Sequence, residues 1–172
     1  MTEPIGLDHV DVFPDGLCES DGYEGTFCST RRPYAWSEGT YTFSLTKEET
    51  VNFEGKPHTW VAYEIKDWKA PDPTRIGRLL FEGEALPLRN SFAAFVEVYG
   101  TQKSVPTVTA SFGYPRVDGK ELSVTKITAM RPSNAPKVST VSMKNDVVIV
   151  TVNPGKLLPH TYGNDPEIIR LK

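Results

Sequence analysis

The sequence has few of the features that mark membrane, nucleic-acid-binding and redox proteins. Its 172 residues include only two cysteines and three histidines, and no apolar run approaches the roughly 20 residues of a membrane-spanning helix. Nineteen basic against 22 acidic side chains leave a formal charge of −3, whereas phosphate backbones attract strongly basic proteins. Residues 1–6 lack the basic start and the apolar stretch of a secretion signal. We therefore expect no membrane insertion and no nucleic-acid partner.

The sequence also lacks the familiar catalytic signatures. It contains no Gly-x-Ser-x-Gly elbow, no phosphate-binding loop, no dinucleotide-binding glycine motif and no His-Glu-x-x-His pair. His9, His58 and His160 lie outside any such motif, and we expect them to have structural or surface roles. Glycoside hydrolysis by paired carboxylates stays open, because Glu64 and Glu97 are among several acids on predicted strands. The sequence therefore favours an enzyme less than a binding module or a structural domain.

Short alternating segments separated by turn residues predict an all-β fold. Thirteen glycines and 14 prolines interrupt the chain, and only residues 47–52 favour as much as one helical turn. Tyr41–Leu45 and Val61–Ile65 alternate like half-buried strands, and Asp118-Gly119 suits a hairpin tip. We predict one domain over residues 1–172, an antiparallel β-sandwich of the jelly-roll type. The other expected strands are Val10–Phe13, Arg75–Phe81, Phe92–Tyr99, Thr107–Tyr114, Leu122–Met130, Lys137–Met143, Val147–Val152 and Glu167–Leu171.

The two cysteines flank a glycine-containing acidic loop. Cys18 and Cys28 lie ten residues apart, which is too far for a Cys-x-x-Cys metal or redox site. A disulfide between them would stabilise the fold by ~2.8 kcal/mol in the chain-entropy model. We predict this disulfide, and with it a secreted or cell-surface location, with two unpaired thiols as the alternative.

Acidic side chains are concentrated around the same loop. Hard oxygen ligands on a glycine-containing loop are what calcium requires, and Asp11, Asp21 and Glu24 are the candidate ligands. Their spacing does not follow the D-x-[DN]-x-[DN]-G calcium loop, so a solvated acidic loop is the alternative. We expect no cofactor apart from this candidate calcium ion.

Aromatic side chains offer the clearest candidate for ligand binding. Alternation along Val61–Ile65 places Tyr63 on the core face and Trp60 and Trp68 on the other. Exposed indole rings edged by charged groups suit the C–H faces and hydroxyls of a sugar, whereas ordinary core packing of the aromatics is the alternative. Alternation along the expected strand Phe92–Tyr99 likewise gives one apolar face and a second face that carries Glu97 and Tyr99. The candidate glycan-binding residues are Trp36, Trp60, Glu64, Trp68, Glu97 and Tyr99.

An ordered set of motifs extends over about residues 8 to 130. It comprises Tyr23-Glu-Gly-Thr-Phe, Pro33-Tyr-Ala-Trp-Ser-Glu-Gly-Thr-Tyr-Thr-Phe43, Thr59-Trp-Val-Ala-Tyr63, Phe92-Ala-Ala-Phe-Val-Glu-Val-Tyr-Gly100 and Ala110-Ser-Phe-Gly-Tyr-Pro115. The set resembles a family of secreted bacterial β-sandwich domains of unknown function. Members of this family often stand beside carbohydrate-active or cell-surface modules.

The resemblance implies sugar binding. It carries over Glu24, Trp36, Tyr41 and Glu97, with no catalytic role for any of them. The chain departs from the family pattern where Phe27 replaces a glycine and where serine, rather than lysine, follows Trp36. The N-terminal half usual in the family is missing.

The function that the sequence favours is a non-catalytic, lectin-like carbohydrate-binding module of a secreted or surface protein, with a polysaccharide or glycan as its partner. The alternative is a structural or protein-interaction β-sandwich domain, because the composition is polar and weakly acidic and edge strands are available for pairing. A polysaccharide-degrading enzyme that uses paired carboxylates comes third.

Overall fold

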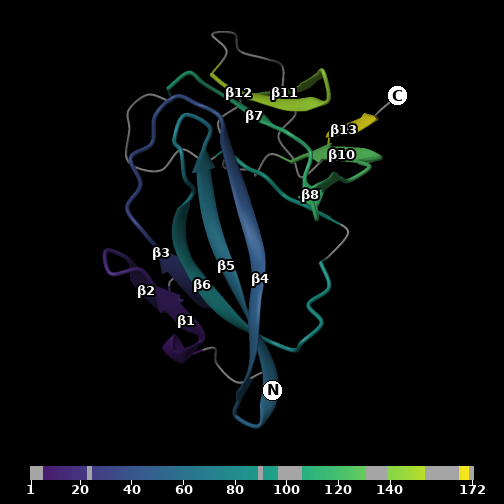
Figure 1. Ribbon diagram of the computed structural model, residues 1–172. Coiled ribbons are helices and arrows are strands. Elements are labelled where there is room, and N and C mark those ends of the chain that lie inside the picture. The colour runs from purple at the N-terminus through teal and green to yellow at the C-terminus, as the bar shows by residue number, and fades with distance from the viewer. Residues whose placement is uncertain are drawn as a thin grey trace. The chain divides into compact units, whose positions relative to one another are not determined.

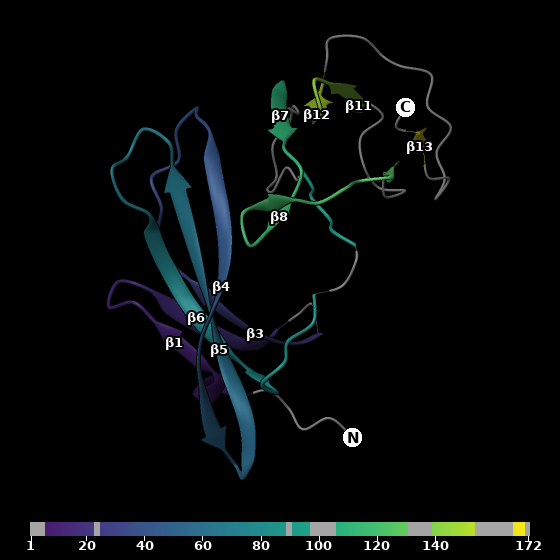
Figure 2. The same cartoon turned by 45° about the vertical axis from the view of Figure 1, so that its right-hand side comes forward.

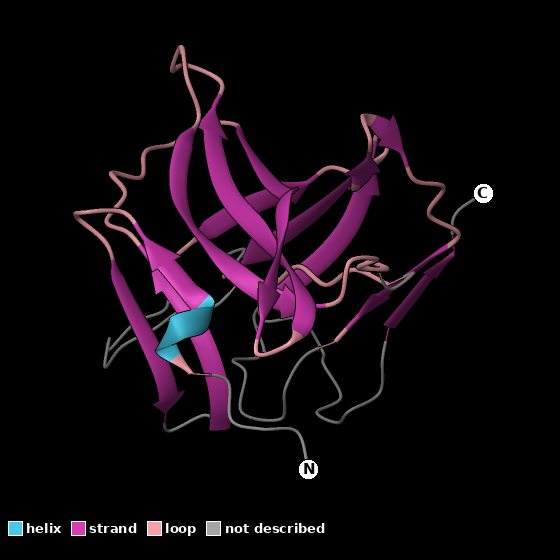
Figure 3. Ribbon diagram, turned by 60° about the horizontal axis from the view of Figure 1, so that its bottom comes forward, coloured by secondary structure: helices cyan, strands magenta, loops and turns pink. Residues whose placement is uncertain are grey.

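The computed structural model describes residues 6–22, 25–88, 91–96, 106–130, 139–153 and 167–170. These residues form antiparallel β-strands and one short 3₁₀ turn, η1 (Leu7–His9) (Figures 1 and 3). The predicted all-β, antiparallel class is therefore confirmed. The chain divides into two compact units, Met1–Leu88 and Arg89–Lys172, while the prediction of a single domain stays a prediction. Within the described residues, no helical segment has the length and apolar character of a membrane span.

The first unit is organised around a four-stranded antiparallel sheet. Its strands follow the order β1-β6-β5-β4, so that β5 is central and β4 lies at an edge. A separate β2–β3 hairpin contacts β1 and β6, as Figure 2 shows. The strands of this unit are β1 (Val10–Val12), β2 (Leu17–Gly22), β3 (Gly25–Arg31), β4 (Tyr41–Phe53), β5 (Lys56–Asp67) and β6 (Thr74–Glu82).

The second unit contains three small sheets. β7 (Val108–Phe112), β12 (Val147–Val152) and β11 (Ser139–Lys144) form the largest, with β12 in the centre. The other two are the pairs β8 (Arg116–Val117) with β9 (Lys120–Glu121) and β10 (Lys126–Ala129) with β13 (Glu167–Arg170).

Tight two-residue turns close three of the hairpins. Glu54-Gly55, Asp118-Gly119 and Asn145-Asp146 all have positive φ at both central positions, as type I′ turns require. This geometry matches the right-handed twist of the strands that it joins. The predicted hairpin tip at Asp118-Gly119 is confirmed.

A β-bulge interrupts the pairing of β4 with β5. Lys47 pairs with Val61 and Thr50 pairs with Thr59, so Glu48 and Glu49 together oppose the single residue Trp60. The predicted helical turn over residues 47–52 is therefore wrong. Good local helix formers stay extended here because the ladder to β5 continues on both sides of the bulge.

Alternation along β5 follows the prediction, but burial does not. Val61, Tyr63 and Ile65 pair with residues of β4 on one side of the sheet, which we call the aromatic face. Trp60, Ala62 and Glu64 point to the opposite side, which we call the charged face. Ala62 is only 1% exposed and Ile65 only 4%, whereas Tyr63 is half-buried. Both faces of the central strand thus contribute to the core.

One predicted strand is wrong in the part that the structure describes. Residues 91–96 have no regular secondary structure, and the rings of Phe92 and Phe95 are 53% and 78% exposed. An alternating apolar pattern forms a strand only with a partner strand, and the described residues pair none with this segment. Glu97 and Tyr99, two of the predicted binding residues, lie outside the described residues.

Gly77 allows β3 to pack closely against β6. A Cβ atom at this position would lie 2.8 Å from the carbonyl oxygen of Asp11 and still closer to the Thr30 hydroxyl. We expect Gly77→Ala to lower the free energy of unfolding by about 1–3 kcal/mol, because β1 or β3 must move. Urea denaturation followed by tryptophan fluorescence measures the change.

Gly39→Ala is the matched control for this variant. A Cβ at Gly39 would make only ordinary contacts, of 3.5 Å or more, with the ring of Tyr41. Its expected effect is within about 0.5 kcal/mol. Equal stability of the two variants would contradict close packing at Gly77.

Candidate ligand-binding site

Five aromatic rings are in contact one after another on the aromatic face. The ring centroids of Tyr34 and Trp36 are 4.6 Å apart, and those of Trp36 and Tyr41 are 5.1 Å apart. Phe43 lies 6.2 Å from Trp36 and 6.2 Å from Tyr63, with which it is stacked. We call this set of five residues the aromatic strip.

The strip exposes apolar surface to solvent. Trp36 is 58% exposed and Phe43 is 56% exposed, while Leu45, the next residue of β4 on this face, is 68% exposed. Tyr34, Tyr41 and Tyr63 are half-buried. Contiguous exposed apolar surface of this kind marks binding sites more often than single exposed side chains do.

Hydrogen bonds tie the segment before β4 to the strand itself. The Tyr41 hydroxyl accepts a hydrogen bond from the Ser37 backbone N–H at 3.1 Å and donates one to the Ser37 carbonyl oxygen at 2.7 Å. This pair fixes the loop that carries Trp36 next to the strand that carries Phe43. The relative positions of the two exposed rings are thus set before any ligand arrives.

Polar groups lie at the edge of the strip. Asp67 pairs with Tyr41 across β4 and β5, at the end of the sheet where Tyr34 contacts Tyr41. Loss of solvent contact raises the pKa of the Tyr34 hydroxyl, and the negative charge of Asp67 raises it further. Tyr34 is therefore a hydrogen-bond donor at neutral pH beside a carboxylate acceptor, a combination that suits sugar hydroxyls.

On the charged face, the guanidinium of Arg78 is contacted from the three other strands of the sheet. Its Nε donates to the carboxylate of Asp11 on β1 at 2.8 Å. Its Nη1 donates to Glu48 at 3.1 Å and also to Glu49, both from the bulge in β4. The guanidinium carbon lies 4.5 Å from the ring centroid of Trp60 on β5, in cation–π contact.

A second arginine shares one of these carboxylates. Arg75 holds Glu48 through two hydrogen bonds, Nη1 to Oε1 at 2.6 Å and Nη2 to Oε2 at 2.8 Å. The hydrogen bond from Arg75 lowers the pKa of Glu48, partial burial opposes this, and Arg78 lowers it further. Burial also acts to lower the pKa of Arg78, but its bonds to Asp11, Glu49 and Glu48 raise it overall. All of these groups are charged and mutually paired at neutral pH.

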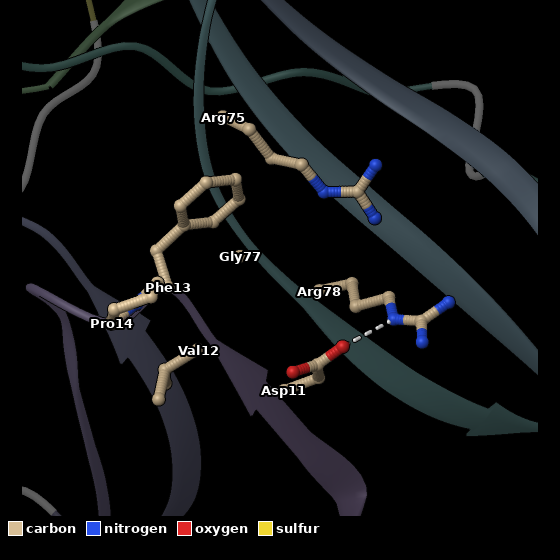
Figure 4. Close-up of a pocket in the computed structure, with 7 residues that line it drawn as sticks. All are labelled: Asp11, Val12, Phe13, Pro14, Arg75, Gly77 and Arg78. Atoms are coloured by element: carbon tan, nitrogen blue, oxygen red, sulfur yellow. Dashed lines mark hydrogen bonds and ion pairs between the residues drawn. The ribbon is translucent and has the colours of Figure 1, made fainter.

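A small cavity of about 150 Å³ adjoins this network (Figure 4). The Asp11 carboxylate points at the Arg78 guanidinium, and the Phe13 ring lies beside the Arg75 side chain. Ligand pockets are usually about 300–1,000 Å³, and both guanidiniums are already occupied by carboxylates. The cavity therefore suits ordered water better than an anionic ligand. Its lining residues are Asp11, Val12, Phe13, Pro14, Arg75, Gly77 and Arg78.

In the part of the chain that the structure describes, the predicted calcium ligands do not come together. Asp11 is bound to Arg78, only the backbone of Asp21 is described, and Glu24 lies outside the described residues. In the part of the chain that the structure describes, no group of three or more His, Cys, Asp or Glu side chains is placed to hold a metal ion. Calcium binding stays a prediction. Among the neighbouring acids, Asp15 and Glu19 form ion pairs with Arg32 and Arg31, and the Asp8 carboxylate lies 2.9 Å from Nδ1 of His9.

The predicted disulfide is not present, and both cysteines are free thiols. In the β2–β3 hairpin, Cys18 pairs with Thr30 and Cys28 pairs with Ser20, so the two cysteines are diagonal neighbours. Diagonal Cα atoms are about 7–8 Å apart, beyond the usual reach of a disulfide. Burial raises the pKa of the Cys28 thiol, and Cys18 and Asp8 raise it further. The predicted secreted or surface location therefore no longer rests on a disulfide.

The structure separates the predicted binding tryptophans. Trp36 belongs to the aromatic strip, whereas Trp60 lies half-buried against Arg78 on the charged face. Trp68 is 69% exposed, as predicted, but it follows Trp60 by eight residues, or roughly 27 Å along an extended strand. Glu64 is half-buried between them. Trp60, Glu64 and Trp68 therefore form no common platform with Trp36.

The residues that the sequence predicts to bind a glycan omit four members of the strip, although the family resemblance includes Tyr41. Tyr41 and Phe43 alternate on β4, Tyr63 lies diagonal to Phe43 on β5, and Tyr34 precedes Trp36 by two residues. Alternation did group Tyr63 on one face, but that face was expected to be core. The available signal was the density of aromatic residues between positions 34 and 43.

No family model, curated protein or solved structure matches this chain.

The ion pair of Glu48 makes stability depend on pH. Its pKa is lower in the folded protein than the usual value of about 4.3, so the pair stabilises the fold fully above that value. This contribution is lost as the pH falls through the lowered value. We expect Glu48→Gln to reduce the free energy of unfolding by about 1–2 kcal/mol at pH 7, and the difference from wild type to shrink from about pH 4 downward.

Glu82→Gln serves as the control, because the Glu82–Lys56 pair is solvated, with side chains 64% and 61% exposed. This variant should match wild type within about 0.5 kcal/mol at every pH. Urea denaturation between pH 3 and pH 7 tests both variants. A Glu48→Gln penalty that is constant over this range would show that the carboxylate charge does not stabilise the sheet.

Proposed function

We propose that this protein is a non-catalytic, lectin-like module that binds a polysaccharide or glycan on the aromatic strip. The observation that carries the proposal is the pair of exposed rings fixed side by side, Phe43 on β4 and Trp36 on the loop that precedes it. Indole and phenyl faces offer apolar area to the C–H face of a sugar ring. The Tyr34 hydroxyl and the Asp67 carboxylate at the edge offer a donor and an acceptor to its hydroxyls.

Rigidity favours this use of the strip. Tyr41, Phe43 and Tyr63 stand on paired strands, and the Tyr41–Ser37 hydrogen bonds hold the loop of Trp36. A site that is ordered before binding loses less conformational entropy when the ligand arrives. In the proposal, the strip belongs to a jelly-roll β-sandwich of a secreted or surface protein.

The charges around the strip favour binding over hydrolysis. Glycosidases need two carboxyl groups about 5–9.5 Å apart across the scissile bond. Among the described residues, Glu48, Glu49 and Asp11 all bind Arg78 on the opposite face, so these carboxylates do not reach the strip. The role proposed for the strip is accordingly recognition.

A protein-interaction domain is the second candidate function. Its supporting observation is the aliphatic and aromatic surface beyond the strip, where Leu45 is 68% and Phe81 is 45% exposed. A sugar ring does not need this additional apolar surface, whereas a protein partner would bury it.

Glycan binding is tested with Trp36→Ala. A glycan array identifies a bound polysaccharide, and titration calorimetry then compares the dissociation constants of wild type and variant. We expect Trp36→Ala to weaken binding by about tenfold or more, because loss of a stacked aromatic costs ~1–3 kcal/mol in comparable base-stacking sites. The melting temperature of the variant should change little, since Trp36 is largely exposed.

Trp68→Ala is the matched control, because Trp68 is also exposed but contacts Thr42 on the other face. It should bind the glycan like wild type. Equal loss in both variants, or none in either, would remove the aromatic strip as the binding surface. An array with no bound glycan would leave the protein-interaction function as the candidate.

A further inference from the structure

β4 has one unpaired edge in the part of the chain that the structure describes, where it pairs with β5 alone. The Thr40 carbonyl oxygen accepts a hydrogen bond from the Trp68 N–H at 3.0 Å. Antiparallel strands alternate between residues that bond to the partner and residues that face away from it. Thr40, Thr42, Ser44 and Thr46 therefore bond toward β5. The backbone N–H and C=O groups of Tyr41, Phe43, Leu45 and Lys47 are directed outward.

The residues along this edge lack the features that usually prevent an edge strand from pairing with another chain. Natural edge strands are usually protected by charges, prolines or bulges. Tyr41–Thr46 contains no charged residue and no proline. The side chains of Phe43 and Leu45 are both more than half exposed. The first charge is Lys47, and the Glu48–Glu49 bulge follows at once and interrupts the regular ladder, which resumes at Thr50. The open segment is therefore Tyr41–Lys47, seven residues centred on Ser44.

We propose that β4 pairs in antiparallel fashion with β4 of a second copy of this chain, about a two-fold axis through Ser44. The bulge sets the register, because only an axis at Ser44 pairs the whole segment with itself. Phe43 then lies opposite the partner's Leu45, and Leu45 opposite the partner's Phe43. Both pairs consist of residues whose backbone groups point outward, so the ladder is complete.

The side chains are self-complementary in this register. On the aromatic face, the two Phe43–Leu45 pairs bury apolar surface, and Tyr41 lies opposite the partner's Lys47. The ammonium group of Lys47 already donates a hydrogen bond to the Glu84 carbonyl oxygen of its own chain, at 2.8 Å. On the charged face, Thr42 faces the partner's Thr46, and the two Ser44 hydroxyls meet at the axis. The two lysines lie at opposite ends of the paired segment, so no like charges are brought together.

The two-fold axis is perpendicular to the sheet and keeps both aromatic faces on the same side. Two aromatic strips would then adjoin across the dimer and could bind one polymer at two points, which increases avidity. The pairing itself rests on β4 and does not require that the ligand be a glycan. Because the interface is small, we expect a dimer that dissociates in the micromolar range.

Leu45→Lys tests the interface, because it places a charge opposite the partner's Phe43 at both symmetric positions. Sedimentation velocity of the full chain over a concentration series measures the dissociation constant. We expect Leu45→Lys to raise it by at least about tenfold. Leu88→Lys is the matched control, because Leu88 is 64% exposed against 68% for Leu45 and lies outside β4. It should dimerise like wild type.

Hydrogen exchange of the wild-type protein gives a second test that needs no variant. The amides of Tyr41, Phe43, Leu45 and Lys47 should gain protection as the protein concentration rises. The amides of Thr42, Ser44 and Thr46 should be protected at every concentration. A chain that stays monomeric at high micromolar concentration would overturn the proposal. So would a dimer that Leu45→Lys does not weaken, or protection of the outward amides that is independent of concentration.

Discussion

The first unit depends on one guanidinium group. Arg78 of β6 receives carboxylates from β1 and from the bulge of β4, and it lies over the ring of Trp60 on β5. A single side chain therefore links all four strands of the sheet across its charged face. The bulge makes this possible: in a regular strand Glu48 and Glu49 would point to opposite faces, whereas opposite Trp60 both reach the same arginine.

Because of this network, the two faces of the sheet differ in what they can do. Loss of one partner of this network leaves the other groups unpaired, and the observed strand order and register bring all of its members together. The arginines and acids on the charged face use their hydrogen-bonding capacity on one another, and that leaves them poorly suited to a ligand. Among the residues that the structure describes, the aromatic face carries no comparable network, and Trp36 and Phe43 are exposed. The aromatic face is therefore the side of the sheet whose side chains are available to a ligand.

Sequence patterns predicted the elements that depend on local residue spacing. They missed the features that depend on contacts with residues distant in the sequence. Alternation identified the strand at Val61–Ile65, and Asp118-Gly119 identified a hairpin, because period and turn chemistry are local properties. The local sequence at Glu48–Glu49 favours a helical turn, and only pairing with β5 keeps these residues extended. Alternation also placed Trp60 and Trp68 on one face correctly. It could not show that Arg78 covers the first of them, because that contact joins residues 18 positions apart in the sequence.

The same bulge also governs what the edge of the sheet can do. It turns two carboxylates onto the charged face and interrupts the regular ladder just after Lys47, and the uncharged segment before it is left open. Soluble proteins seldom keep exposed apolar side chains next to free backbone donors and acceptors, because both invite association. Phe43 is exposed, lies in the aromatic strip and directs its backbone outward. A ligand on the strip and a second strand on the edge would therefore contact the same residue, so binding at one surface is physically coupled to pairing at the other.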